Sequence, residues 1–352
     1  MILIINPGST STKVALYEGG NMVVQESLNH SAGDLAAFAR IADQLDMRVG
    51  TVQEFLGRHN VQVSQLAAVM ARGGVLHPLT AGIYRVNDRM LQDCSEARIA
   101  EHASNLGALI ADRIVQGTSV PCYIADPVSV DEFEDVARIS GLKELPRRSL
   151  VHALNIRRVA YNVAKGHGKD LSELNMIVAH LGGGISIAPL RRGRIVDVNN
   201  ANEQGPFSPE RAGGVPAVGL VKLSFEAGAS EGAIVRNLTR EGGLVSYLGT
   251  NSAREVEARI GAGDARAALV YEGMAYQIAK EIGAMATVLE GDVDVIVLTG
   301  GLANSDMLTR WIIERVGFIA PVEIVPGENE LEALNEAYLR LAQGIEAEKT
   351  YV

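Results

Sequence analysis

Four polar residues stand where an apolar run of the sequence stops: Asn6, Arg72, Asp126 and His180. Short apolar runs bounded by turn residues are typical of buried strands. Ligands of open α/β sheets gather at the carboxyl ends of such strands. The placement of these four side chains therefore indicates a polar binding site that is assembled from strand ends.

The stretch "IINPGSTSTKVALY", residues 4–17, holds the first candidate anion site. After the Asn-Pro-Gly turn, hydroxyl groups such as those of Ser9 and Ser11, together with Lys13, can meet a phosphate alongside backbone N–H groups. No G-x-x-x-x-G-K-[ST] string occurs in the chain, and no G-x-G-x-x-G follows a strand, so neither a Walker A loop nor a dinucleotide fingerprint is present. An ordinary hairpin explains the same residues equally well when they are taken alone.

Two further glycine clusters follow apolar runs. "AHLGGGIS" places Gly182, Gly183 and Gly184 between two apparent strands, where three glycines weaken both strands unless a ligand approaches the backbone closely. "LTGGLANSDML" places Gly300 and Gly301 between a buried strand and a helix. A tight turn, with a positive φ at Gly301, is the alternative for the second cluster. Three such sites in one chain favour a nucleotide.

Other reactive side chains lie in distinctive local settings. "RRSLVHALN" puts His152 in an apolar context near Asn155, and "EHASNLG" puts His102 beside Asn105 at a helix start. Two prolines precede and two glycines follow Arg211 in "GPFSPERAGGVP", a loop stiff enough to hold the arginine in one place. No H-x-x-x-H spacing occurs, which argues against a zinc site held by the protein.

Composition limits the classes of function. The chain has 352 residues, which favours about two domains, and 47% of them are hydrophobic. The net charge of -10 and the lack of a basic block argue against nucleic-acid binding. Cys94 and Cys122 are the only cysteines, so we expect a reduced, cytoplasmic protein. We expect no signal peptide and no membrane span.

The order of apolar runs predicts alternating strands and helices. Residues 1–5 and 14–17 are expected as strands, 31–45 as a helix that starts at a capping serine, and 331–345 as a final amphipathic helix. The strand–turn–strand pattern of residues 175–190 repeats the layout of the first 17 residues. This echo predicts two domains of similar topology whose turns face a shared cleft.

These residues resemble one known family. Its motifs occur here in the family's order, over essentially the whole chain: "INPGSTSTK", "ARGG", "EHASNLGA", "ADPVSVDEFEDVAR", "HALN", "AHLGGGISIA", "GPFSPERAGG", "YLGT", "VLTGGLA" and "PGENELEAL". They are similar to those of the butyrate kinases, which belong with acetate kinase in the acetate/sugar kinase–Hsp70–actin superfamily. Branched-chain fatty acid kinase is a close relative that the motifs do not separate.

The resemblance implies an α/β fold of two actin-like (ribonuclease H-like) domains with duplicated mixed-sheet topology around a nucleotide cleft. The first domain is expected to span 1–130 plus the C-terminal helix 331–352, and the second, nucleotide-binding domain 131–330. Two departures from acetate kinases fit the butyrate branch. Gly183 replaces an asparagine in the phosphate turn, and the loop of Arg211 reads "ERAGG" in place of threonine-arginine-serine-glycine.

The resemblance, with the local motifs, also implies the site residues. The expected catalytic residues are Arg72, Asp126, His152 and Arg211. Those expected at the acid substrate are Arg72, His102 and Asn105. Those expected at the nucleotide are Asn6, Ser9, Ser11, Lys13, His180, Gly182, Gly183, Gly184, Gly300 and Gly301. Those expected near the metal are Asn6 and Glu330.

The implied reaction is the reversible phosphorylation of butyrate, or a similar short or branched fatty acid, by ATP with Mg²⁺. A carboxylate is already ionised at neutral pH and needs no strong base, so the site must mainly offset repulsion between anions. The expected partners are the short-chain carboxylate, ATP and further copies of the chain. Three alternatives stay open: a kinase acting on a sugar hydroxyl with Asp126 as base, a non-catalytic ATP-binding scaffold, and an NAD-dependent oxidoreductase.

Overall fold

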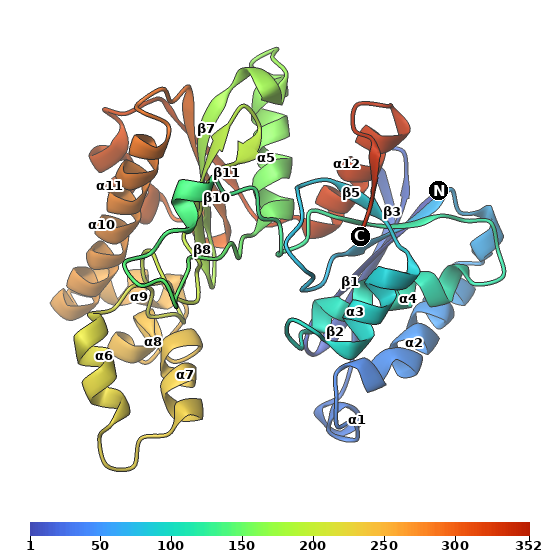
Figure 1. The fold of residues 1–352 in the computed structure, drawn as a ribbon, viewed down its shortest axis with the longest axis horizontal. Helices are drawn as coiled ribbons and strands as arrows, with labels where there is room; N and C mark the ends of the chain where they lie inside the picture. Colours follow the sequence, from blue (N-terminus) through green and yellow to red (C-terminus); the bar gives the residue numbers. More distant parts are fainter. The chain divides into compact units, whose positions relative to one another are not determined.

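The structure is a computed structural model that describes all 352 residues (Figure 1). The chain forms two compact units, Met1–Asp131 with Asn329–Val352, and Glu132–Glu328. We describe each unit by itself, and the domain bounds expected from the sequence stay a prediction. No helix is both long and apolar enough to cross a membrane.

The first unit is built on a seven-stranded mixed sheet with the order β12-β5-β6-β4-β1-β2-β3. β1 lies at its centre with every residue buried, pairs antiparallel with β2 and pairs parallel with β4. The hairpin of β1 and β2 is the strand–turn–strand expected from the opening sequence. The strands are β1 (Ile2–Pro7), β2 (Ser11–Glu18), β3 (Asn21–Asn29), β4 (Ala68–Arg72), β5 (Ile83–Arg85), β6 (Cys122–Ala125) and β12 (Glu348–Thr350).

Helices cover this sheet. α4 packs on β1, β4 and β6, and α12 packs on β1, β2 and β4; the two helices lie on opposite sides of the sheet in Figure 1. The helices of the unit are α1 (Ala32–Ala36), α2 (Leu45–Arg58), α3 (Asp88–Glu96), α4 (Leu106–Val115) and α12 (Glu330–Ala342), with short 3-10 turns η1 (Ala42–Gln44), η2 (Val63–Gln65) and η3 (Ala103–Asn105).

Two expected helices differ from the sequence prediction. Ser31 does cap a helix, but α1 ends at Ala36 and buries no residue, so nothing stabilises a continuous helix to Leu45. The backbone N–H groups of Arg40 and Ile41 donate instead to carboxylates, which starts a new turn. The final helix also stops before Ile345, because Gly344 adopts a φ of 70°.

The second unit repeats the sheet of the first. Its strand order, β11-β10-β7-β8-β9, has an antiparallel β7–β8–β9 meander and parallel β7–β10–β11 pairs, as the order β6-β4-β1-β2-β3 has in the first unit. The echo between the two halves of the sequence is therefore confirmed. The strands are β7 (Asn175–Leu181), β8 (Ile185–Arg191), β9 (Arg194–Ile195), β10 (Val295–Gly300) and β11 (Val322–Pro326).

The core of this unit gathers around the long helix α10, which packs on β7, β8 and α11. α5 packs on β7 and β10. Figure 1 shows α5 on one side of the sheet and α10 with α11 on the other. The helices are α5 (Ala153–Gly166), α6 (Ala217–Ser224), α7 (Glu231–Thr239), α8 (Gly243–Leu248), α9 (Ala253–Gly261), α10 (Ala265–Val288) and α11 (Asp306–Val316), with 3-10 turns η4 (Asp135–Arg138), η5 (Leu171–Glu173) and η6 (Gly301–Asn304).

Candidate functional site

Three of the expected site residues of the first unit meet at one carboxylate. Asn6, at the end of β1, donates from Nδ2 to Glu330 Oε2 over 2.5 Å. Arg72, at the end of β4, pairs through Nη1 with Glu330 Oε1 at 2.8 Å. Glu330 is the first residue of α12, so the folded chain joins residues 324 positions apart. These three side chains form one polar cluster, which we call the Glu330 cluster.

One acceptor atom of Asn6 has no hydrogen-bond partner within the protein. Asn6 is 4% exposed, and its Oδ1 atom is buried with no hydrogen-bond partner. A buried acceptor without a partner costs free energy, on the order of 1–3 kcal/mol, unless water or a ligand satisfies it. No group of three or more His, Cys, Asp or Glu side chains is arranged to hold a metal ion. The carboxylate of Glu330 and the amide oxygen of Asn6 are oxygens of the kind that hard cations prefer, and a metal at this cluster stays a prediction.

The first turn exposes the side chains of Ser9 and Lys13. Gly8 N–H donates to Ser11 O over 2.8 Å and closes the turn, while Ser9 is exposed. Lys13 is exposed and lies opposite Asn6 in the β1–β2 ladder, so the two side chains share one face of the sheet. Of the four hydroxyl residues, Thr12 is fully buried and contacts His30. The exposed hydroxyl and ammonium groups are of the kind that bind anions, and their contact with a nucleotide stays a prediction.

Asp126 is held in an unusual backbone conformation directly after β6. Its φ is 40°, its side chain is buried, and it exchanges two hydrogen bonds with Gly82. Gly82 N–H donates to Asp126 Oδ1 over 2.7 Å, and Asp126 N–H donates to Gly82 O over 3.0 Å. A non-glycine residue at positive φ is uncommon and marks positions where the backbone is constrained. Arg72 pairs with Ala125 where the parallel strands β4 and β6 end. Asp126 therefore lies at the same carboxyl end of the strands as Arg72 of the Glu330 cluster.

The side-chain amide of Asn105 is hydrogen-bonded to two backbone groups. Its Oδ1 accepts from Val75 N–H at 2.8 Å, and its Nδ2 donates to Ala100 O at 2.9 Å. The amide therefore ties the loop that follows Arg72 to the start of α4. These contacts support a role in holding that loop, and direct contact with the substrate stays a prediction.

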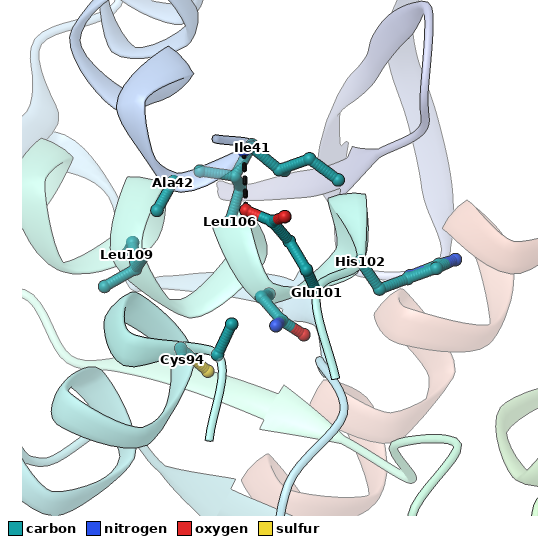
Figure 2. Close-up of a pocket in the computed structure, with 9 residues that line it drawn as sticks. Ile41, Ala42, Cys94, Glu101, His102, Leu106 and Leu109 are labelled. Carbon is teal, nitrogen blue, oxygen red and sulfur yellow. Dashed lines mark hydrogen bonds between the residues drawn. The ribbon is translucent and has the colours of Figure 1, made fainter. Parts of the chain in front are cut away.

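His102 caps the turn η3, where its Nδ1 accepts from Ser104 N–H over 3.2 Å. It lies at the rim of a small cavity shown in Figure 2, and its ring points away from Cys94 and Leu109 on the other side. The cavity measures about 10 Å³, which is room for roughly one water molecule. In this structure the cavity is too small for an acyl chain.

Two histidines of the second unit lie face to face. The rings of His152, just before α5, and His180, on β7, stack with centroids 4.2 Å apart and planes 14° apart. Asn155 Nδ2 donates to the carbonyls of Gly327 and Glu328, so its Oδ1 is the acceptor for His180 Nδ1 at 2.8 Å. His180 therefore carries a proton on Nδ1.

His152 is anchored as well, because its Nδ1 lies 2.9 Å from Ser186 Oγ on the neighbouring strand β8. Ser186 is fully buried. Sequence reasoning singled out His152 and His180 separately but did not find their contact or Ser186. A lone serine in an apolar strand carries no local signal of such a role.

The three-glycine turn and the Arg211 loop are fitted to one another. A Cβ atom added to Gly184 would lie 2.5 Å from Arg211 Nη1, so only glycine lets the guanidinium approach the turn. Ser208 Oγ donates to Gly183 O and accepts from Arg211 N–H over 3.1 Å, which links the loop to the turn. None of the three glycines has a positive φ, so closeness rather than turn geometry requires glycine here.

Arg211 does not form a surface ion pair with a neighbouring carboxylate, which an exposed loop would allow. Arg211 is partly buried and makes no ion pair with Glu210 or Glu203. Burial lowers the pKa of Arg211 from its ordinary value, and the charge of Glu210 partly opposes that shift. Glu210 itself accepts from Asn251 Nδ2 at 2.6 Å. A desolvated cation beside a glycine turn is suited to a phosphoryl group.

The last glycine pair closes β10. Gly300, not Gly301, adopts the positive φ, 88°, and a Cβ there would lie 2.4 Å from Leu181 O. Gly301 begins η6 with open space where its side chain would be. Gly300 therefore allows β10 to pack closely against Leu181 beside the three-glycine turn, and Gly301 leaves room at the strand end.

The two cysteines take no part in this chemistry. Burial raises the pKa of Cys94 to about 12, and burial likewise raises the pKa of Cys122 to about 12. Both thiols therefore stay protonated at neutral pH and are poor nucleophiles. The candidate site residues described in each unit are cations, amides, imidazoles and carboxylates, so no chemistry through sulfur is indicated.

Known proteins resemble this chain over its whole length. The sequence model of the acetokinase family matches residues 142–337. The chain is 50% identical to the "Probable butyrate kinase 2" of Caldanaerobacter subterraneus subsp. tengcongensis, over 99% of each chain. It is 46% identical to the "Butyrate kinase 2" of Clostridium acetobutylicum, again over 99% of each.

Solved structures share the fold. An acetate kinase from Porphyromonas gingivalis superposes with a TM-score of 0.79 at 18% identity, covering 97% of this chain and 99% of that one. A propionate kinase from Francisella tularensis gives 0.77 at 19% identity, covering 95% and 98%. A ROK hexokinase from Thermus thermophilus gives 0.52 at 10% identity, covering 97% and 99%. The expected α/β class with two mixed sheets is confirmed.

Proposed function

Because the chain belongs to the acetokinase family, we propose that it transfers the γ-phosphoryl group of ATP to butyrate or a similar short or branched fatty acid. The products are the acyl phosphate and ADP, and the reaction is reversible. The observation that carries this proposal is the 50% identity, over 99% of both chains, to a protein named as a probable butyrate kinase. The two sequence relatives, both named as butyrate kinases, favour none of the sugar-kinase, scaffold and oxidoreductase alternatives.

The proposed transfer is in line. A carboxylate oxygen forms a bond to the γ-phosphorus while the bond to the bridging oxygen breaks, and that electron pair leaves with ADP. No proton has to be removed from the acceptor, which is ionised at neutral pH. The protein's task is therefore to position two anions and to stabilise the charge on the phosphoryl group.

The second unit supplies cationic and neutral donors for the phosphoryl group. Arg211 is desolvated and fitted against Gly184, so we propose that it stabilises charge in the transition state. His152 is held by Ser186 and by its stack on His180, which supports a fixed hydrogen-bonding role. Gly182 and Gly183 complete the proposed phosphate turn.

The first unit supplies groups for the acid and the metal. Arg72 is proposed to bind the substrate carboxylate together with His102 and Asn105, as the family resemblance implies. In this structure Arg72 pairs with the carboxylate of Glu330, the same kind of group. Asn6 and Glu330 fit a Mg²⁺ ion, because Asn6 Oδ1 is buried without a partner and both offer hard oxygens. When bound with ATP, Mg²⁺ neutralises charge on the phosphate oxygens.

Acyl-hydroxamate formation tests the proposal. Purified protein is incubated with ATP, Mg²⁺, hydroxylamine and each straight or branched acid from two to six carbons. We expect hydroxamate with butyrate, and a higher kcat/KM for C4–C5 acids than for acetate. Two buried methylenes at about 0.8 kcal/mol each correspond to roughly fifteenfold. No product with any acid would remove the proposal, and acetate used best would contradict the butyrate preference.

Arg211→Ala is the internal test of mechanism. A transition-state arginine in phosphoryl transfer is worth roughly 10³–10⁵ in rate. We expect kcat to fall at least about a thousandfold with ATP affinity nearly unchanged. Arg211→Lys should recover only part of the loss, because a point charge does not replace a planar guanidinium. A folded Arg211→Ala protein that keeps a tenth of the wild-type kcat would exclude the role.

We also propose a cytoplasmic homo-oligomer, on the basis of the family resemblance. Light scattering coupled to gel filtration measures the mass of the assembly against 37.5 kDa for one chain. A mass of one chain at micromolar concentration would rule the oligomer out.

A further inference from the structure

Helix α2 places an arginine where its pattern calls for an apolar side chain. The buried face of α2 consists of Arg48, Val49, Val52, Phe55 and Leu56. Arg48 is 0% exposed, the largest fully buried side chain of the protein. Arginine is almost never fully buried unless its charge and donors are met by partners. The partners of Arg48 therefore indicate what it does.

The partners are the carbonyls of the first turn. Arg48 Nη1 donates to Gly8 O at 2.9 Å and to Ser11 O at 3.2 Å, and Nη2 donates to Ser9 O at 3.1 Å. Nη1 also donates to Thr12 Oγ1 at 3.1 Å. Gln44 Oε1 accepts from Nε and Nη2 and fixes the plane of the guanidinium. One side chain thus holds four acceptors within five consecutive residues.

This contact orients the N–H groups of the turn. In a trans peptide unit, the carbonyl of one residue and the N–H of the next point in opposite directions. Because the Gly8 and Ser9 carbonyls point inward at Arg48, the N–H groups of Ser9 and Thr10 point away from it. Neither N–H donates to another group of the chain, and both residues are exposed. Two adjacent free N–H groups form a concavity that binds anions.

The charge of Arg48 is also uncompensated. No carboxylate pairs with it, and no acidic group perturbs it. Burial lowers the pKa of Arg48 to about 10, which leaves it protonated at neutral pH. A whole positive charge therefore lies behind the turn, surrounded by carbonyl and hydroxyl oxygens, the Gln44 amide and the nearby His30 imidazole, with no carboxylate among them. An anion on the outer side of the turn would supply the missing opposite charge.

We propose that Arg48 is the positioning residue of the first phosphate turn, holding its carbonyls inward so that its N–H groups and Ser9 receive the phosphates of the nucleotide. The proposal rests on the proposed function only in taking the anion to be ATP or ADP. Arg48 touches no substrate, and it acts through the turn.

Binding measurements test this without relying on turnover. The dissociation constants of ATP and of adenosine are measured for the wild type, Arg48→Met, Arg48→Lys and Arg58→Met. Arg58 is the matched control, because it lies on the same helix with a half-exposed side chain that pairs with Glu26 at the surface. Adenosine lacks phosphates, so it reports losses that have another cause.

We expect Arg48→Met to weaken ATP at least tenfold and adenosine less than twofold. Arg48→Lys should fall between Arg48→Met and the wild type, because an ammonium cannot reach four acceptors at once. Arg58→Met should match the wild type for both ligands. Melting temperatures show whether each variant is folded.

Several results would overturn the proposal. One is a folded Arg48→Met that binds ATP within twofold of the wild type, and another is an equal loss for ATP and adenosine. If Arg48→Met does not fold, the affinities for ATP and adenosine are compared for Arg48→Lys. An equal loss of affinity for both ligands in that variant also contradicts the proposal. A wild type that binds ATP no better than adenosine also overturns it. A wild type that binds ATP but makes no hydroxamate overturns the proposed function alone.

Discussion

The imidazole rings of His152 and His180 stack 4.2 Å apart although they come from a loop and a strand 28 residues apart in the sequence. Each ring is held at Nδ1, His152 by Ser186 and His180 by Asn155. Stacking against a ring whose own orientation is fixed limits the rotation of His152. We infer that His180 acts on the phosphoryl group mainly through His152.

Replacing His180 therefore tests an indirect effect. A ring pair is worth roughly 0.5–1.5 kcal/mol, or about twofold to thirteenfold in rate if the stack acts only in the transition state. We expect His180→Ala to lower kcat roughly tenfold and His180→Phe to lower it less, because phenylalanine keeps the stack. Steady-state kinetics with butyrate checks this. His167→Ala, which removes an exposed histidine paired with Glu323, is the control. Equal losses for Ala and Phe would contradict a stacking role.

Gly184 should matter because of Arg211. A methyl group at Gly184 would overlap Arg211 Nη1, so Gly184→Ala should displace the guanidinium and lower kcat at least tenfold. In an Arg211→Ala background the same change should cost little, because the group it displaces is gone. Gly183→Ala is the control, because a methyl group there would approach only Glu210 Oε2, at 3.8 Å. Any loss of kcat that Gly183→Ala causes should therefore be the same in the wild type and in the Arg211→Ala protein. Additive losses for Gly184→Ala would argue against this coupling.

Glu330→Gln tests the metal assignment. The amide keeps the size of Glu330 and removes its negative charge, but its one carbonyl oxygen can accept from only one of the two donors, Asn6 or Arg72, that each meet a separate carboxylate oxygen now. We expect the Mg²⁺ concentration for half-maximal rate to rise about tenfold, with the KM for butyrate within about threefold. Rates are measured over a Mg²⁺ titration at fixed ATP. Glu332→Gln, the same change two residues along α12, should leave the titration unaltered. An unshifted Glu330→Gln curve would place the metal elsewhere.

Two substitutions separate the charge of Asp126 from its conformation. Asparagine tolerates a positive φ and can accept from Gly82 N–H, so Asp126→Asn should melt within a few degrees of the wild type. Alanine loses the hydrogen bond, worth about 1–3 kcal/mol when the donor is left buried, and should melt clearly lower. If the carboxylate charge is needed, both variants should lose at least about a hundredfold in kcat. An active Asp126→Asn protein would assign Asp126 a structural role.

Much of the fold followed from local patterns. The apolar runs that became β1, β4, β6, β7 and β10 were visible as strands, because a buried strand in a parallel sheet is a short apolar run bounded by turn residues. The helix expected over 31–45 was wrong. Its periodicity was helical, but α1 finds nothing to bury against, and the carboxylates of Asp43 and Glu101 take the backbone N–H groups beyond it.

By itself the sequence determined the family, the order of the elements and the types of residue available for chemistry, since these depend on neighbours along the chain. Only the tertiary structure decided which of those residues meet. Glu330 reaches Asn6 across 324 positions, Arg211 lies against Gly184, and Arg48, which no sequence motif marks, is buried against the carbonyls of the first turn. Such contacts are set by how helices pack on sheets and by where buried donors find acceptors, and no local spacing encodes either.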